Sequence, residues 1–360
     1  MPTLCLLASL ALGLASQDDG RLPEPSAKGH LRSVCLDLIG RPPFAPEVER
    51  WSGSPRAVVV REILAGDEFW RHWLDEQLYY FLLIDNFRPE TEGVTGLPGL
   101  LAGAEIGVVE ALHRICLSSS FDRRNPGPDT FVTVVMEQLL GITVQKSLRE
   151  LEIGKKIYDG GSGKFLGQAG SSQADVVNIA IGDERAPRYF LAREYARLVR
   201  SEPEPEELAT WSRQLVSEPR SYAALVATWL ESPAYERRLT RRAPLPNRLY
   251  VRALFVDLLG RLPGSEEGQR LRSALDGMAD ARPLRSLFAR LLLDSGKVTL
   301  PERAQITDPE AWVTGNLERL LGRPTLPAER TEFLAAFRDP ACRPATVLYA
   351  IVSHPEYQTW

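Results

Sequence analysis

Apolar residues recur along most of the chain at three- and four-residue spacing, which is typical of helices with one buried face. The first clear example places Leu31, Val34, Leu38 and Ile39 on one side of a predicted helix. The next residue is a glycine, which accepts the left-handed conformation of a helix cap, and two prolines then prevent the helix from resuming. The pattern predicts an all-α protein.

The same pattern returns along the chain with charged residues in register, which indicates an internal repeat. The matched positions are Asp37, Gly40 and Arg41 in copy 1, Asp257, Gly260 and Arg261 in copy 3, and Gly322 and Arg323 in copy 4. Copy 2, near Arg193, is more divergent. A proline-containing link and an acidic residue follow, at Glu47, Glu207, Glu267 and Glu329. The acidic residue favours the start of a second helix.

One such copy cannot bury its own apolar face, so neighbouring copies must stack on one another. We therefore expect repeated helix-turn-helix units packed into a two-lobed helical array. The expected first domain covers residues 30–240, with copy 1, an unrepeated insert over 70–190, and copy 2. The expected second domain covers residues 246–360, with copies 3 and 4.

Three helices are predicted in the insert, over 70–87, 99–117 and 129–140, although the run Phe131–Val135 is β-prone. The glycine-rich stretch 158–172 is expected to be a surface loop. Its Gly160-Gly-Ser-Gly-Lys164 run fails as a phosphate loop, because Phe165 stands where a magnesium-binding Ser or Thr is required.

The first residues form a short apolar run that ends in small residues, which is the pattern of a cleaved signal peptide over residues 1–16. We therefore expect an exported protein, periplasmic or extracellular. No transmembrane segment is expected, because the most apolar later stretch, 97–117, contains Glu105, Glu110 and Arg114.

The 360-residue chain has a net charge of −4, and its many arginines are interspersed with acids. This distribution is not the one-signed patch that binds nucleic acid, so no nucleic-acid partner is expected. Beyond Cys5 in the predicted signal, the cysteines are Cys35, Cys116 and Cys342. This odd, widely spaced set is not a disulfide framework, although one pair could form.

Known signatures of catalytic and metal sites are missing from the sequence. It has no Gly-x-Ser-x-Gly, His-Glu-x-x-His or Cys-x-x-Cys motif, so we expect no cofactor and no metal. The most distinctive polar and aromatic candidates are His72, Trp73, Asp75 and Glu76. His72 with Glu76, or His113 with Cys116, could supply two metal ligands, but packing is the favoured interpretation because zinc needs three or four.

The pairs Asp37–Arg41 and Asp257–Arg261 lie four residues apart. Each arginine could clamp an anion. It could instead close its helix and pair with the aspartate. We favour this structural role, because repeat units recur for packing whereas an active site is seldom copied.

Residues 30–85 resemble a domain of unknown function found in secreted planctomycete proteins, often beside a haem c module. The resemblance rests on Leu36-Asp-Leu-Ile-Gly-Arg-Pro-Pro43 and on Arg71-His-Trp-Leu-Asp75. It implies export and an association with haem proteins, but this chain has no haem-attachment motif. Copies 2 and 4 resemble the phycobilisome-linker-like helical module, which implies an interaction role and carries no catalytic residue.

These patterns favour a non-catalytic interaction or scaffold protein of the cell envelope, with another envelope protein or a glycan as partner. One alternative is an enzyme or accessory protein of polysaccharide breakdown, with its site in 70–172 and Asp75, Glu76 and Asp85 as candidate acids. Another alternative is a redox partner of a haem c protein.

Overall fold

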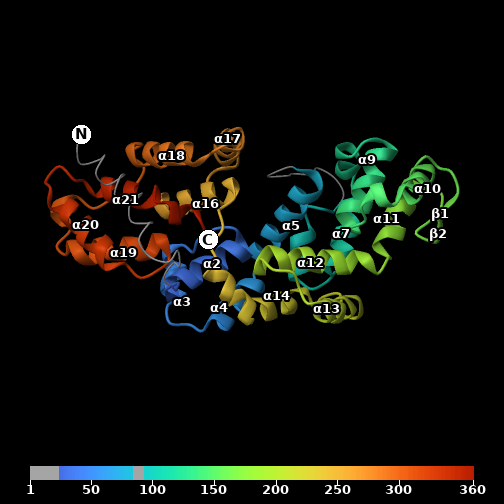
Figure 1. The fold of residues 1–360 in the computed structure, drawn as a ribbon, viewed down its shortest axis with the longest axis horizontal. Coiled ribbons are helices and arrows are strands. Elements are labelled where there is room, and N and C mark those ends of the chain that lie inside the picture. The colour runs from blue at the N-terminus through green and yellow to red at the C-terminus, as the bar shows by residue number, and fades with distance from the viewer. Residues whose placement is uncertain (1–23, 84–92) are drawn as a thin grey trace. The chain divides into compact units, whose positions relative to one another are not determined.

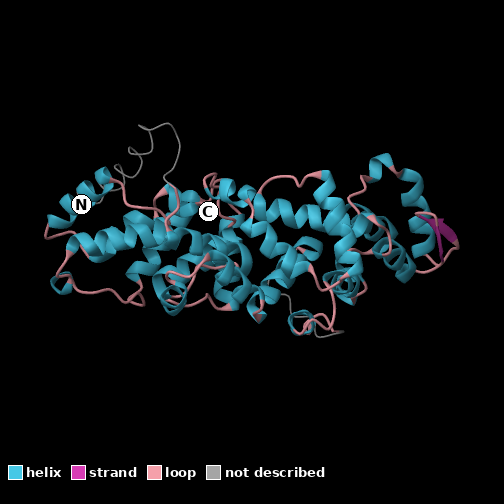
Figure 2. Cartoon of the chain, turned by 90° about the horizontal axis from the view of Figure 1, so that it is seen from below, coloured by secondary structure: helices cyan, strands magenta, loops and turns pink. Residues whose placement is uncertain are grey.

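The computed structural model describes residues 24–83 and 93–360. The predicted signal segment 1–16 and Asp85 lie outside these residues. Within them the chain forms 20 α-helices, short 3-10 and π-helical turns, and one two-stranded hairpin, which confirms the all-α prediction (Figure 1 and Figure 2).

The chain divides into two compact units. Within the described residues, the terminal unit comprises 24–59 and 236–360, and the central unit comprises 60–83 and 93–235. The chain passes between them within α4 (Arg56–Leu64) and within α15 (Pro233–Leu239). This division differs from the expected domain 30–240, because most of copy 1 groups with copies 3 and 4.

The terminal unit is built from the helices of copies 1, 3 and 4. These are α2 (Ala27–Ile39), α3 (Ala45–Trp51), α16 (Asn247–Leu259), α17 (Ser265–Asp276), α18 (Arg282–Asp294), η4 (Arg303–Gln305), α19 (Pro309–Leu321), α20 (Pro327–Arg338), α21 (Pro344–Val352) and η5 (Pro355–Gln358). Their apolar faces enclose one core that includes Tyr250, Phe255, Val313 and Ile351.

The central unit contains the insert and copy 2. Its elements are α5 (Asp67–Leu82), α6 (Leu97–Ala102), α7 (Val108–Cys116), α8 (Ser119–Arg124), α9 (Gly127–Val134), η2 (Val135–Leu139), η3 (Val144–Lys146), α10 (Leu148–Tyr158), β1 (Gly163–Phe165), β2 (Gln168–Gly170), α11 (Gln173–Ile181), α12 (Arg185–Val199), α13 (Pro205–Ser217) and α14 (Tyr222–Glu231).

All four copies have the same order of three helices, and the first helix of each ends on a left-handed residue. In copies 1, 3 and 4 this residue is glycine, with φ of 67° at Gly40, 63° at Gly260 and 70° at Gly322. Copy 2 places Arg200 there, with φ of 56°. Glycine suits this position because it adopts positive φ without steric cost.

Copies 1 and 4 approach each other closely at two glycines. The backbone N–H of Ser26 donates to the carbonyl of Gly322 over 3.1 Å. A Cβ atom on Gly29 would lie 1.8 Å from the same oxygen, so only glycine fits there. The first turn of α2 therefore covers the cap of α19.

The insert departs from the predicted elements in two places. The helix predicted over 99–117 is wrong, because the chain breaks between α6 and α7, where Ala104 has a φ of 52°. The glycine-rich stretch contains the hairpin β1–β2 instead of being only a loop. Its two-residue turn, Leu166 and Gly167, has positive φ at both residues, which matches the twist of a tight hairpin.

Residues 129–140 are helical, as predicted, despite their β-prone run. Helix α9 continues into the π-helical turn η2, in which Val135, Met136 and Leu139 are buried. Burial against neighbouring helices outweighs the β preference of this segment.

Candidate functional site

In three copies the arginine of the repeated Gly-Arg sequence forms the same ion pair with a glutamate of the next helix. We call this pair the Arg–Glu joint. The arginine reaches the acidic residue six positions later, in the first turn of the second helix. The N–O distances are 2.6 and 2.8 Å for Arg41–Glu47, 3.0 and 3.5 Å for Arg261–Glu267, and 2.8 and 2.5 Å for Arg323–Glu329. Each arginine also donates to the carbonyl of the residue that follows it.

The glutamate of each joint also accepts the backbone N–H that begins the second helix. These donors are Phe44, Gly264 and Leu326, at 2.7, 3.2 and 3.0 Å. Burial raises the pKa of Glu47 and Glu329, but hydrogen bonds from their arginines outweigh it and hold the pKa below its usual range. The joint thus fixes the angle between two helices while satisfying a backbone donor.

The predicted pair of Asp257 with Arg261 is wrong, because the two side chains make no ion pair with each other. Asp257 instead accepts from Arg32 of copy 1, over 3.0 and 2.8 Å, and from the Tyr357 hydroxyl over 2.8 Å. Asp257 therefore binds an arginine of another copy, whereas Arg261 binds residues of its own copy.

Asp37 of copy 1 is likewise bound by residues far along the chain. It accepts from Arg238 over 2.7 Å and from the indole nitrogen of Trp360 over 2.8 Å. The side chains of Asp37 and Arg238 are 2 % and 1 % exposed, so the pair is shielded from solvent. The repeated aspartates therefore join distant segments of the chain within the terminal unit.

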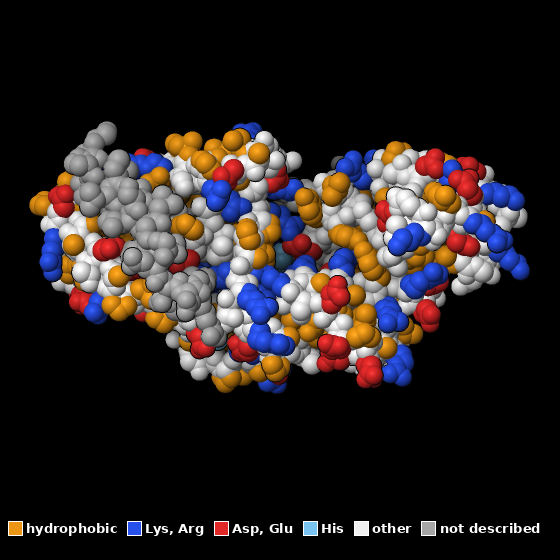
Figure 3. All heavy atoms as spheres, in the orientation of Figure 1, with side chains coloured by type: hydrophobic (Ala, Val, Ile, Leu, Met, Phe, Trp, Pro, Cys, Tyr) orange, Lys and Arg blue, Asp and Glu red, His pale blue; other side chains and the backbone are white. Residues whose placement is uncertain are grey.

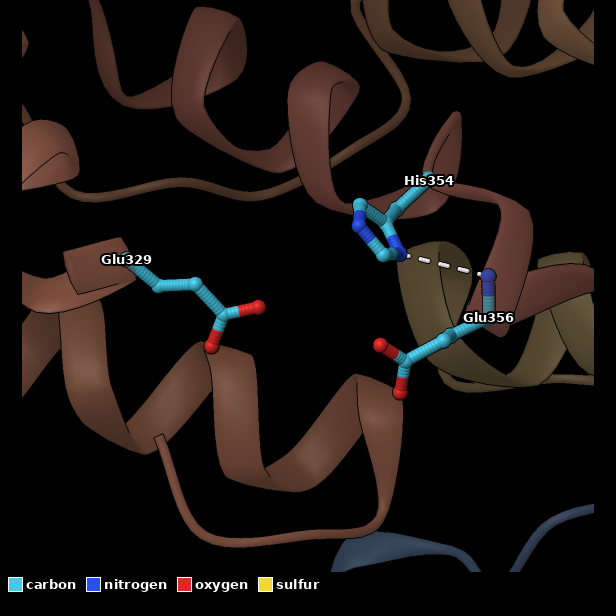
Figure 4. A group of neighbouring side chains, drawn as sticks. All are labelled: Glu329, His354 and Glu356. Carbon is cyan, nitrogen blue, oxygen red and sulfur yellow. Dashed lines mark hydrogen bonds between the residues drawn. The ribbon is translucent and has the colours of Figure 1, made fainter. Parts of the chain in front are cut away.

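Copy 4 carries the group that most resembles a metal site: Glu329, His354 and Glu356 (Figure 4). Both carboxylates and the imidazole face one space in that view. However, Arg323 donates to Glu356 over 2.6 and 2.7 Å as well as to Glu329. Arg242 also lies 3.5 Å from Glu356, so two arginines balance the two acids. The imidazole Nδ1 accepts the Glu356 backbone N–H over 3.2 Å.

The central unit has a buried carboxylate of its own, Glu194 on α12. It accepts from Gln77 over 3.1 Å, from Tyr222 over 2.8 Å and from Arg197 over 3.0 Å. Burial raises its pKa, but the positive charges of Arg197 and Arg193 lower the pKa by more than burial raises it, so its value is about 2. The group is ionised, and its contacts tie α5 and α14 to α12.

The four polar and aromatic candidates lie on α5. Trp73 is 1 % exposed, and its ring packs 6.3 Å from Phe190 and 6.4 Å from Tyr222, between centroids. His72 is buried with Nε2 3.4 Å from Glu76, and Asp75 is half-buried. Trp73 belongs to an aromatic core and is not part of an exposed sugar-binding surface.

The weaker metal candidates are also held by packing. His113 lies 2.8 Å from the amide oxygen of Asn178, while Cys116 is buried and burial raises the pKa of its thiol to about 12. Cys35, Cys116 and Cys342 are all buried. Lys164 of the failed phosphate loop lies on β1, and not at a helix start.

A pocket of about 350 Å³ lies in the terminal unit, where no sequence motif predicted one. It is formed by the first two turns of α2, the end of α3 and the start of α4. Its lining is Ala27, Lys28, His30, Leu31, Val34, Val48, Trp51, Ser52, Gly53, Ser54, Pro55, Arg56 and Val59. No short sequence pattern could have predicted it, because its lining residues come from three helices and form no recognisable motif.

Exposed apolar side chains gather over α18 and the preceding turn (Figure 3). They include Met278, Leu287 and Leu291, which are 51 %, 50 % and 57 % exposed. No helix in residues 24–83 and 93–360 is long and apolar enough to cross a membrane.

Comparisons with protein-family models, with curated proteins and with solved structures found no match to this chain.

Proposed function

We propose that this protein is a non-catalytic helical scaffold or interaction protein, and that it is exported to the cell envelope. The observation that supports the proposal most directly is the recurring Arg–Glu joint. In three copies the charged residues of the most distinctive motif bind each other, the local backbone or a neighbouring copy. Repeats of this kind generate surface for partners without requiring a reactive centre.

The buried tryptophans of the insert also support a non-catalytic role. The residues that could line a sugar-binding groove are used in packing: Trp70 and Trp73 are 6 % and 1 % exposed. Sugar recognition by aromatic rings requires an open face, which a buried ring does not offer. Among the described residues, the polysaccharide-enzyme alternative therefore rests on the half-buried side chains Asp75, Glu76, Tyr79 and Tyr80. Its third candidate acid, Asp85, lies outside them.

The test begins with cross-linking in the intact envelope, followed by expression of the cross-linked partner and measurement of binding between the two purified proteins. We expect saturable binding with a dissociation constant of about 1 µM or below, as is usual for a specific interface. Release of reducing ends from envelope polysaccharides is measured in parallel.

Two variants separate the scaffold from the enzyme. Asp75→Asn and Glu76→Gln each remove a candidate catalytic carboxyl and should leave partner binding unchanged. Polysaccharide cleavage that either variant abolishes would overturn the proposal, as would binding to glycans with no protein partner. Haem that co-purifies with the partner would favour the redox alternative.

A further inference from the structure

The pocket formed by α2, α3 and α4 combines an apolar floor with a positively charged rim. Its floor includes Val34, Val59 and Trp51, which are 1 %, 4 % and 8 % exposed. Among the described residues that line it, Lys28 and Arg56 are charged and none is an Asp or a Glu. A volume of about 350 Å³ falls in the range of small-molecule sites, which are concave and mostly apolar.

The helices that form the pocket add to its positive character. Lys28 lies in the first turn of the 13-residue helix α2, and Arg56 is the first residue of the nine-residue helix α4. The N-terminal end of a helix carries a partial positive charge that favours anions. The Arg56 side chain forms an ion pair with Glu236, which lies outside the pocket lining and offsets part of the charge of the arginine, so Lys28 supplies most of the positive charge at the rim.

His30 adds a neutral polar group to the wall. Burial lowers the pKa of its imidazole, and the negative charge of the nearby Glu236 offsets only part of this effect. A neutral imidazole offers one hydrogen-bond donor and one acceptor. Together with the hydroxyls of Ser52 and Ser54, it can orient the polar end of a ligand.

We propose that this pocket binds a small amphipathic anion: a compact apolar body of about one or two rings that carries a single carboxylate or sulfonate. The apolar body lies against Val34, Val59 and Trp51, and the acid group lies at the rim near Lys28 and Arg56. This site goes beyond the scaffold role, since it assigns a ligand to a place formed within copy 1.

The first probe is 8-anilinonaphthalene-1-sulfonate, an apolar aromatic anion whose fluorescence rises on burial, titrated into the full-length protein. Displacement is then compared for 4-phenylbutyrate and its neutral analogue 4-phenylbutanol. We expect the acid to displace the probe at a concentration at least about fivefold lower than the alcohol, since one charge near a protein surface contributes on the order of 1 kcal/mol or more.

Variants assign the signal to the pocket. Val48→Phe fills the cavity and should abolish the displaceable fluorescence, while Lys28→Gln and Arg56→Gln should each weaken phenylbutyrate binding about threefold to tenfold. Arg270→Gln, on the exposed face of α17 in the same unit, is the matched charge control and should change nothing. Leu287→Ser with Leu291→Ser removes exposed apolar side chains that could bind the probe nonspecifically, and should leave the displaceable signal intact.

Two results would overturn the proposal. One is a displaceable signal that persists in Val48→Phe with unchanged affinity. The other is equal displacement by the acid and the alcohol, with neither Lys28→Gln nor Arg56→Gln changing it. The two charge variants keep the test decisive even if Val48→Phe fails to fold.

Discussion

The guanidinium of Arg32 and the carboxylate of Asp257 form a two-point ion pair, with N–O distances of 3.0 and 2.8 Å, across 225 residues of sequence. The pair joins the first helix of copy 1 to the first helix of copy 3. Their side chains are 10 % and 4 % exposed, so water screens the interaction poorly. This contact explains why copy 1 belongs to the same compact unit as the last third of the chain.

Removing either partner should destabilise the terminal unit. We expect Arg32→Met and Asp257→Asn each to lower the free energy of unfolding by about 3 kcal/mol, because each leaves a buried charge without its partner. The double variant should lose less than the sum, which denaturant unfolding of all four proteins would measure. Additive losses would show that the two residues act independently. The exposed pair Arg270–Glu266 is the control, and Arg270→Gln should cause no measurable change.

Alanine substitutions at two glycines of the terminal unit should change the free energy of unfolding in opposite directions. Gly29→Ala places a Cβ 1.8 Å from the Gly322 carbonyl, so we expect a loss of about 2 kcal/mol in the free energy of unfolding. Gly315→Ala, in the interior of α19, meets no atom within 4 Å and should gain about 0.5–1 kcal/mol. Thermal melts of the two variants test the pair, and a neutral Gly29→Ala would contradict the close approach of α2 to α19.

The stability of the central unit should depend on pH through Glu194. The pKa of this carboxyl is about 2 in the folded chain, below its ordinary value of 4.5. Its stabilisation is therefore complete above about pH 4.5 and is lost as the pH falls toward 2. The shift corresponds to about 3 kcal/mol at most.

Urea unfolding between pH 2 and 6 measures this dependence, with the fluorescence of the central-unit tryptophans as the signal. These are Trp70, Trp73, Trp211 and Trp229. Glu194→Gln should be less stable at pH 6 and should lose much of the slope between pH 4.5 and 2. Glu207→Gln, at an exposed position on α13, should keep the parent slope. An unchanged slope in Glu194→Gln would refute the assignment.

The local features of the fold were predictable because short stretches of sequence encode them. Gly40, Gly260 and Gly322 each follow an apolar helix and precede a proline-containing link, and all three adopt the cap conformation. The acidic residues Glu47 and Glu267 were expected at helix starts, and they lie there. Their bond to the arginine six positions earlier was missed, although the constant spacing in three copies was a usable signal.

Long-range features could not be predicted in the same way. Arg238 lies 201 residues from Asp37 and Arg32 lies 225 residues from Asp257, and a single sequence carries no sign of which distant arginine each aspartate binds. The break at Ala104 was missed because glycine spacing in this stretch suggested close helix packing instead of a helix end. The pocket beside Trp51 was missed because it exists only where three helices meet.

Two matched double-mutant cycles test directly whether the repeated Arg–Glu joint stabilises the folded chain. Arg323 and Glu329 are 1 % and 5 % exposed, whereas Arg261 and Glu267 form the same joint at 46 % and 36 % exposure. Each cycle combines Arg→Gln and Glu→Gln at its pair. We predict a coupling energy of about 2 kcal/mol or more at the buried joint and below about 0.5 kcal/mol at the exposed one. Negligible coupling at both joints, with full stability in Arg323→Gln, would contradict the account.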